Sequence, residues 1–271
     1  MRIFVVTDME GVCGVIDHDN WVMPTSRNYE EGRRLLTLEI NAAVEGFIAA
    51  GASEILVADG HGAGGVNQAY LDRRTLLQRG FPGPYPFGLD SGFDAMAWVG
   101  QHAKAGTPLA HIAHTGWFNV LDYRINDVSV GELGQLAFCG AALGVPSIFA
   151  SGDEALTREA AALLTGIETV SVKRGLTPGS GDEYDTEGYR GRNLAAVHLH
   201  PEKARELIRD GAERAFKRLV RSRREFPLVK LAAPFRREVS YRPSGSTPAY
   251  RAVAEHETDF IAAMNAPERK V

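Results

Sequence analysis

The sequence predicts an α/β fold: a mostly parallel sheet flanked by helices in a Rossmann-like layer, followed by a second, smaller α+β domain. Three observations lead to this prediction. Short apolar segments alternate with segments of helical periodicity along the first part of the chain. Several of the apolar segments lack polar alternation, which is typical of strands buried on both faces of a parallel sheet. The chain then becomes polar and rich in glycine after Lys173.

The first predicted domain covers residues 1–172. Its expected strands are apolar almost throughout, and they span residues 2–7, 54–58, 95–99, 147–151 and 167–172. Its expected helices span residues 30–50, 132–143 and 153–164. Gly51 and Gly144 follow the first two helices as terminating residues, and Asp153 is placed to cap the third through its side chain.

The second predicted domain covers residues 173–271 and is a smaller α+β unit. It opens with a long loop from Leu176 to Arg192, whose glycines and acidic residues predict irregular structure. A helix beginning at Pro201 and two strands, at residues 226–233 and 237–242, are expected after the loop. We expect the loop to border the entrance of the functional site, because loops commonly carry specificity.

Composition limits the classes of function. The 271 residues carry a net charge of -4, so no basic field attracts nucleic acid. We expect no membrane partner, because no apolar run is long enough to span a bilayer and no signal-peptide pattern is seen. The two cysteines, Cys13 and Cys139, imply no disulfide framework and fit a cytoplasmic location.

Side chains that can bind metals follow the predicted strands. Asp8 and Glu10 follow the first strand, His61 the second and His102 the third, while Glu132 begins a helix. Ligands of an open α/β sheet bind beyond the carboxyl ends of its strands, so we expect these five residues to converge there. Mixed histidine and carboxylate sets suit zinc, manganese or iron.

The spacing of the first two carboxylates favours more than one cation. Residues two apart in an extended chain point the same way, with Cα atoms about 6–7 Å apart. Asp8 and Glu10 would therefore repel each other unless cations lie between them. Two metal ions about 3.5–4 Å apart are one solution. Gly11 follows at once, and we expect it to allow a sharp turn of the backbone.

A competing motif is "GHGAGG" at residues 60–65, which matches the glycine pattern of dinucleotide-binding proteins. That interpretation requires a helix directly after the glycines and an acidic residue about 20 residues later. A helix near residues 68–77 would not be joined tightly to the last glycine, and residues 80–88 contain no aspartate or glutamate. A non-catalytic protein that binds a nucleotide or another small molecule remains the alternative.

The motifs "TDMEGVCG", "ADGHG", "VGQHAKAGTP", "HTG", "IND" and "VGELG" occur in this order, and together they resemble the D-aminopeptidase family of metallopeptidases. Members of that family carry two zinc ions on an α/β fold and remove amino acids from peptide N-termini. The resemblance therefore implies an aminopeptidase of short peptides with two Zn²⁺ ions per chain, which Mn²⁺ or Co²⁺ could replace. It also implies a ring-like homo-oligomer.

The motifs carry the family's functional residues over to this sequence. The resemblance implies that Asp8 bridges both zinc ions. Glu10 and His61 would complete the site of one ion, and His102 and Glu132 would complete the site of the other.

The resemblance also assigns a catalytic histidine. His114, in "AHTGW", matches that position, although His111 lies only three residues earlier. The preference for D-amino acids is carried over less directly, because loops such as 176–192 commonly set substrate choice. A metal-dependent hydrolase of another amide or of an ester is therefore kept as a second alternative.

Overall fold

The computed structural model describes residues 1–80 and 83–271, and it confirms the predicted α/β fold. Within these residues the larger sheet has the strand order β3-β2-β1-β4-β7-β8-β9. Neighbouring strands are parallel except for β8 and β9, which are antiparallel. The strands are β1 (Arg2–Thr7), β2 (Glu54–Asp59), β3 (Leu76–Gln78), β4 (Ala95–Gln101), β7 (Ser147–Asp153), β8 (Glu168–Gly175) and β9 (Ala196–His198).

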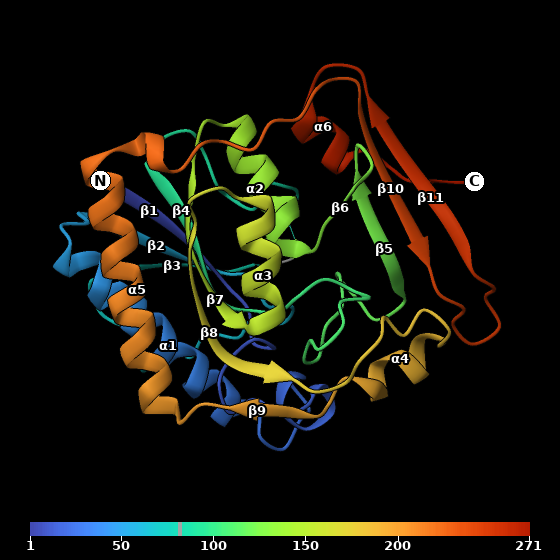
Figure 1. The fold of residues 1–271 in the computed structure, drawn as a ribbon, viewed down its shortest axis with the longest axis horizontal. Coiled ribbons are helices and arrows are strands. Elements are labelled where there is room, and N and C mark those ends of the chain that lie inside the picture. The colour runs from blue at the N-terminus through green and yellow to red at the C-terminus, as the bar shows by residue number, and fades with distance from the viewer. Residues whose placement is uncertain (81–82) are drawn as a thin grey trace.

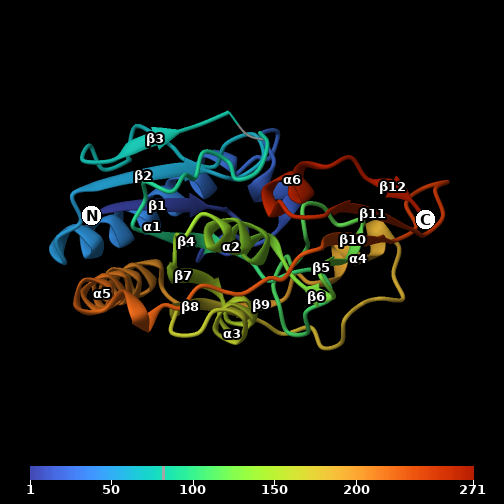
Figure 2. The same ribbon diagram turned by 90° about the horizontal axis from the view of Figure 1, so that it is seen from above.

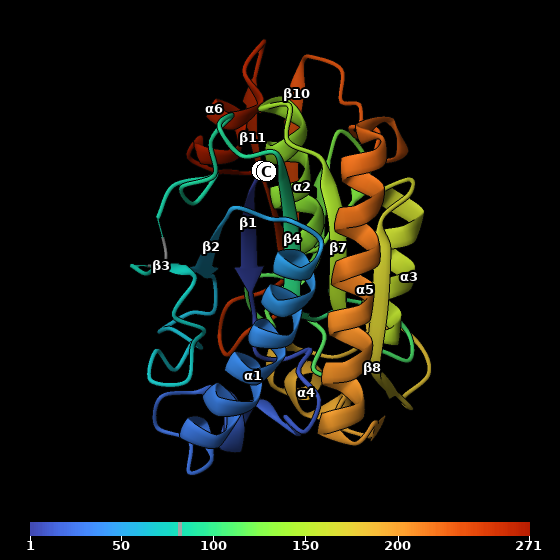
Figure 3. The same cartoon turned by 90° about the vertical axis from the view of Figure 1, so that its left-hand side faces the viewer.

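Helices cover both faces of the larger sheet (Figure 1 and Figure 3). One face is covered by α1 (Tyr29–Ala49) and α5 (Pro201–Arg221), which pack against each other, and the other by α2 (Glu132–Ala142) and α3 (Glu154–Leu163). Successive side chains of a strand point to opposite faces. Val5 of β1 accordingly joins one apolar core cluster and Phe4 joins the other. Both faces are buried, which explains why the strand is apolar throughout.

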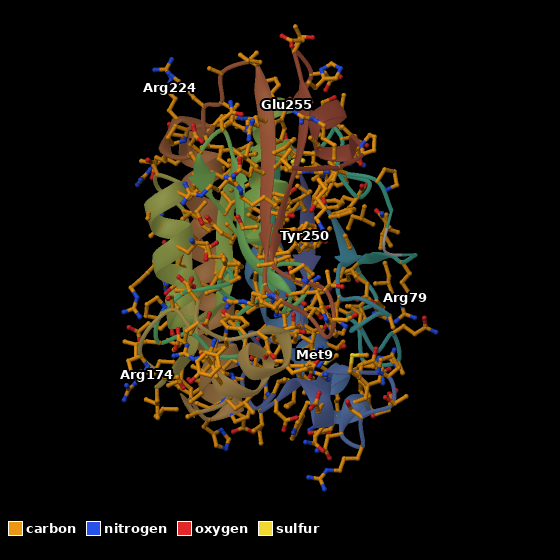
Figure 4. All side chains as sticks on the ribbon, turned by 90° about the vertical axis from the view of Figure 1, so that its right-hand side faces the viewer. Met9, Arg79, Arg174, Arg224, Tyr250 and Glu255 are labelled. Atoms are coloured by element: carbon orange, nitrogen blue, oxygen red, sulfur yellow. The ribbon has the colours of Figure 1, made fainter. Side chains whose placement is uncertain are left out.

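A smaller antiparallel sheet lies beside the larger one, as the view from above shows (Figure 2). Its strand order is β12-β11-β10-β5-β6. The strands are β5 (Val120–Ile125), β6 (Val128–Ser129), β10 (Phe235–Tyr241), β11 (Tyr250–His256) and β12 (Arg269–Lys270). Tyr250 and Glu255 mark β11 in Figure 4, and α6 (Phe260–Asn265) packs against this sheet and against α2.

The two sheets interleave along the chain. Strands β5 and β6 precede residue 173 but belong to the smaller sheet, whereas β9 and α5 follow it but belong to the larger layer. The division into domains at residues 172 and 173 stays a prediction. Within the described part of the chain, no helix is both long and apolar enough to cross a membrane.

Three sequence-based expectations were wrong in the C-terminal half and around residue 70. Residues 226–233 form no strand, because proline at position 227 lacks a backbone donor and the segment instead connects η2 (Arg223–Glu225) to β10. Residues 186–192 are helical (α4, Thr186–Arg192), since the Asp185 side chain accepts from the Gly188 N–H at 2.8 Å and caps the helix. Residues 68–75 form turns rather than a helix, and β3 follows them.

Candidate metal centre

The segments that follow β1, β2 and β4 meet beyond the carboxyl ends of these strands. They surround a cavity of about 440 Å³. Five of the six residues expected at the site line this cavity, namely Asp8, Glu10, His61, His114 and Glu132. The sixth, His102, is buried directly behind Asp8, with its Nε2 atom 3.2 Å from Asp8 Oδ2. The structure therefore brings all six residues together, as expected from the strand ends.

The ligand atoms form two groups of three. Asp8, Glu10 and His61 make the first group, and within it the ligand atoms lie within 4.8 Å of one another. His102, His114 and Glu132 make the second group under the same limit. The short distance between Asp8 and His102 joins the two groups, so Asp8 lies between them.

The hydrogen bonding of His102 fits a cation at this place. Its Nδ1 atom donates to the Ala103 carbonyl at 2.9 Å, so Nε2 is the ring atom left to bind a proton or a cation. Nε2 faces carboxylate oxygens of Asp8 at 3.2 Å and Glu132 at 3.7 Å. Three electron-rich atoms repel one another unless a cation or a proton lies between them. A metal ion meets this need with a donor set that suits zinc or manganese.

The environment of Glu10, which belongs to the group with Asp8 and His61, also fits a bound cation. Its Oε2 atom is buried and has no hydrogen-bond partner among the described residues. Its Oε1 atom lies 3.7 Å from His61 Nε2, which is too far for a hydrogen bond. Buried polar atoms are normally paired, so an unpaired carboxylate oxygen beside a histidine fits a metal ligand.

The charges of the cluster attract positive charge. Burial and the nearby charge of Glu10 raise the pKa of Asp8 to about 7. Burial alone would lower the pKa of His61, but the charge of Glu10 outweighs it and raises this pKa to about 9. Burial acts in the same way on His102, whose pKa is nevertheless raised well above its usual range, chiefly by Glu132 and Asp8. The carboxylates thus outweigh the cost of burying positive charge, as a cation site requires.

His114 differs from the other histidines of the cluster. Its ring stacks on His102 with centroids 4.1 Å apart, and its Nδ1 atom donates to the Ile112 carbonyl at 3.0 Å. Burial and the charge of His102 lower the pKa of His114 to about 4. The ring is therefore neutral, and the tautomer set by Ile112 leaves Nε2 free to accept a proton.

His111 lies apart from the cavity. Its side chain is fully buried, and its backbone N–H donates to Asp153 Oδ2 at 3.1 Å. Burial lowers the pKa of His111 to about 2. Asp153 also caps α3 by accepting from the Leu156 N–H at 3.1 Å, which confirms its expected capping role. Both residues therefore support the backbone near the site.

A glycine is needed at position 11 for a different reason from the one expected. Its φ lies outside the left-handed region, so no sharp glycine turn is needed. Instead its N–H donates to the Gly100 carbonyl at 2.8 Å, and an added Cβ would lie 2.0 Å from the Gln101 carbonyl oxygen. The segment that carries Asp8 and Glu10 therefore packs directly on the backbone that leads to His102.

Gly11→Ala is expected to force these two ligand segments apart. Overpacking of this kind costs about 1–3 kcal/mol in the free energy of unfolding, and backbone cannot move aside as a side chain can. Chemical denaturation and metal analysis measure the effect, and both stability and metal content should fall. Gly191→Ala is the control, because nothing lies within 4 Å of its added Cβ. A Gly11→Ala protein with normal stability and metal content would contradict the close-approach explanation.

Gln101 was not identified from the sequence. Its side-chain amide donates to Asp8 Oδ2 at 2.8 Å and lies 3.5 Å from Glu132 Oε2. It therefore orients one carboxylate from each ligand group. Its place directly before His102, at the end of a strand, was the available signal. That position alone does not distinguish it from an ordinary polar loop residue.

The glycine motif after β2 positions His61 and does not open a helix. Asp59 accepts from the backbone N–H groups of Gly65 at 2.7 Å and Val66 at 3.1 Å. Turns and then β3 follow the loop. Dinucleotide binding relies on a helix N-terminus directly after the glycines, so the nucleotide interpretation is not favoured.

The segment 176–192 reaches the rim of the cavity through Arg190. The Arg190 guanidinium lies over the ring of Trp117, 5.9 Å from its centroid, and hydrogen-bonds to Asp19. Trp117 lines the cavity, and His18, another lining residue, contacts its ring edge to face. These aromatic lining residues were also missed in the sequence, because isolated aromatic residues more commonly belong to a core.

Three comparisons place the chain among known proteins. A family model described as D-aminopeptidase matches residues 1–257. A D-aminopeptidase of Bacillus subtilis (strain 168) is 34% identical over 179 residues, which cover 64% of this chain and 64% of that relative. A solved structure, described as a zinc-dependent D-aminopeptidase from Bacillus subtilis and a self-compartmentalizing protease, has a TM-score of 0.81. It is 24% identical and covers 97% of this chain and 94% of its own, so it supports the fold.

Proposed function

The chain belongs to the D-aminopeptidase family, and from this premise we propose that it is a zinc-dependent aminopeptidase that removes N-terminal residues from short peptides. The observation that carries the proposal is the convergence of five side chains that can bind metals, with Asp8 3.2 Å from His102 and His114 stacked on His102. Family membership was expected from the order of the sequence motifs, and the family match confirms it.

We assign the metal ligands as follows. Asp8 would hold both ions, Glu10 and His61 would complete one site, and His102 and Glu132 would complete the other. The proposed occupant is two Zn²⁺ ions per chain, with Mn²⁺ or Co²⁺ as substitutes. The mixed nitrogen and oxygen donors support zinc, and the Bacillus subtilis relative of similar fold is described as zinc-dependent.

The chain's own residues have separate tasks in the proposed reaction. Bound zinc supplies Lewis acidity, which activates water as a nucleophile and polarises the scissile carbonyl. His114 accepts at Nε2 the proton that the attacking water loses and passes it to the leaving amine, while its Nδ1–H stays hydrogen-bonded to the Ile112 carbonyl at 3.0 Å. Gln101 holds the Asp8 and Glu132 carboxylates in position by donating its amide hydrogens.

Cleavage of a free and a blocked peptide tests the function. We expect the zinc-loaded protein to release alanine from Ala-Gly-Gly but not from its N-acetyl form, and to stop after addition of a chelator. Comparison of the D-Ala and L-Ala peptides measures the stereochemical preference, and we propose the D form. Equal cleavage of the acetylated peptide would instead favour a hydrolase of other amides, and cleavage of esters alone would favour an esterase.

We also propose that copies of this chain assemble into a ring-like homo-oligomer in the cytoplasm. The support is the Bacillus subtilis structure of similar fold, which is described as self-compartmentalizing. Enclosed active sites would admit short peptides and exclude folded proteins. Multi-angle light scattering measures the mass directly, and a stable monomer would contradict the assembly.

A further inference from the structure

We propose that the cavity has a closed end that selects an N-terminal residue with an apolar, uncharged side chain. This inference rests on the proposed aminopeptidase function. The closed end is formed by residues from β1, β4, α2 and the turn before Leu89: Val6, Tyr85, Phe87, Trp98 and Leu136. All five line the same cavity as the candidate metal ligands.

Three of the five residues of the closed end belong to the packed core of the protein. Val6 and Trp98 are paired neighbours on β1 and β4, and both belong to the core cluster on the α2 face of the sheet. Leu136 of α2 faces them from the same cluster. The exposed fractions of Val6, Trp98 and Leu136 are 8%, 0% and 2%. A substrate side chain that enters here therefore meets packed core atoms on the sheet side and the helix side.

The remaining wall is the turn that contains Tyr85 and Phe87. Their rings lie 4.4 Å apart between centroids, and the Tyr85 hydroxyl hydrogen-bonds to Gln135 of α2. Asn265 of α6 fixes the backbone of this turn, because it accepts from the Tyr85 N–H at 2.8 Å and donates to the Tyr85 carbonyl at 2.9 Å. Asn265 lies beyond the residues that match the family model, so this wall depends on a part of the chain outside that match.

The five residues that form the closed end are all uncharged. The Tyr85 hydroxyl and the Gln135 side chain are hydrogen-bonded to each other. The Trp98 indole N–H has no hydrogen-bond partner in the described part of the chain. A buried charge without a counter-charge is costly, whereas an apolar side chain gains from leaving water. The site should therefore reject lysine, aspartate and glutamate side chains and accept leucine or phenylalanine.

The direction of the bound peptide follows from exposure. Met23, Pro24 and Trp117 also line the cavity, and of these Pro24 is exposed and Trp117 is 39% exposed. An aminopeptidase must stop the chain on the amino side of the first residue, and the buried core residues of the closed end provide such a stop. The first side chain therefore occupies the closed end, and the rest of the peptide leaves past Trp117.

Matched substrates test this selectivity on the zinc-loaded protein. We compare X-Gly-Gly peptides, in the enantiomer that is cleaved, with leucine against its near-isostere asparagine and norleucine against lysine. The kcat/KM for the apolar member of each pair is expected to be at least about tenfold higher, the scale on which apolar pockets discriminate. Calorimetric binding of the same peptides gives a second measurement that does not depend on turnover.

Two substitutions on one helix test the location. Leu136→Ala enlarges the closed end, so the ratio of kcat/KM for phenylalanine over alanine at the first position should rise several-fold. Leu133→Ala removes the same atoms from a fully buried site on α2 that does not line the cavity, so the ratio should stay unchanged. If Leu136→Ala fails to fold, the paired peptides (leucine with asparagine, norleucine with lysine) still test the selectivity on the unaltered protein.

The outcomes separate this inference from the proposed function. Cleavage of alanyl peptides with equal kcat/KM for leucine and asparagine would overturn the apolar closed end and leave the aminopeptidase intact. An absence of all cleavage would overturn the function instead. In that case the calorimetric comparison still judges the closed end, and equal binding of the paired peptides would overturn it.

Discussion

Asp8→Asn is expected to leave less than one metal ion per chain, where the unaltered protein should hold about two. Asp8 belongs to the ligand group of Glu10 and His61, and its Oδ2 atom also lies 3.2 Å from His102 Nε2. Asparagine keeps the size of the side chain but removes the negative charge and one ligand oxygen. In the proposed assignment, both ions would lose a ligand in this single change. Elemental analysis of the purified variant measures the loss.

Two further variants make the result specific. Glu10→Gln should lose about one ion rather than two, because Glu10 belongs to one site only in the proposed assignment. Asp127→Asn is the matched control, since Asp127 is an exposed turn residue with φ of 67° that asparagine readily adopts. It should keep all its metal. If Asp8→Asn also keeps a full complement of metal, Asp8 does not bridge the two sites.

His114→Ala is expected to keep both metal ions and the fold while its turnover falls by about 10²–10⁴-fold, the usual cost of losing a general acid–base group. This fall corresponds to about 3–5.5 kcal/mol of activation free energy. The reason is the free Nε2 atom beside the cavity, since Nδ1 is already bonded to the Ile112 carbonyl. Steady-state kinetics on Ala-Gly-Gly measure the effect, with KM and kcat determined separately.

His111→Ala provides the comparison for His114. Its side chain is fully buried away from the cavity, so we expect lower stability and nearly normal turnover. If His111→Ala lost turnover and His114→Ala lost only stability, His111 rather than His114 would be the catalytic histidine. His114 lies within ligand distance of His102 and Glu132, so metal content must be measured in the same preparation. Loss of metal from His114→Ala would make it a ligand.

The convergence of the site residues could be predicted because it depends on strand ends. The apolar run before Asp8 marks a buried strand, and the same holds for the runs before His61 and His102. In a parallel sheet these ends share one edge, so sequence order is sufficient to bring the side chains together. The role of Gly11 could not be predicted, because its close contact with Gln101 depends on how β1 and β4 pack.

The smaller sheet shows where prediction from sequence stops. Strand β5 carries charged residues and was not identified, since its stability comes from pairing with β10, which is far away in the sequence. The segment 226–233 has the apolar character of a strand, but it pairs with no strand among residues 1–80 and 83–271. Short edge strands such as β3 and β12 are difficult to predict for the same reason, because they also depend on a pairing partner. Strand propensity reflects the tertiary partners more than the segment itself.

In the proposed function, peptide cleavage needs two zinc ions that Asp8 would hold together. The most direct test of this requirement is a titration of the metal-free protein with zinc, in which the rate of alanine release from Ala-Gly-Gly and the bound zinc per chain are measured together. We expect little activity at one zinc ion per chain and a plateau at about two. Full activity at one ion per chain, or undiminished activity without metal, would contradict this requirement.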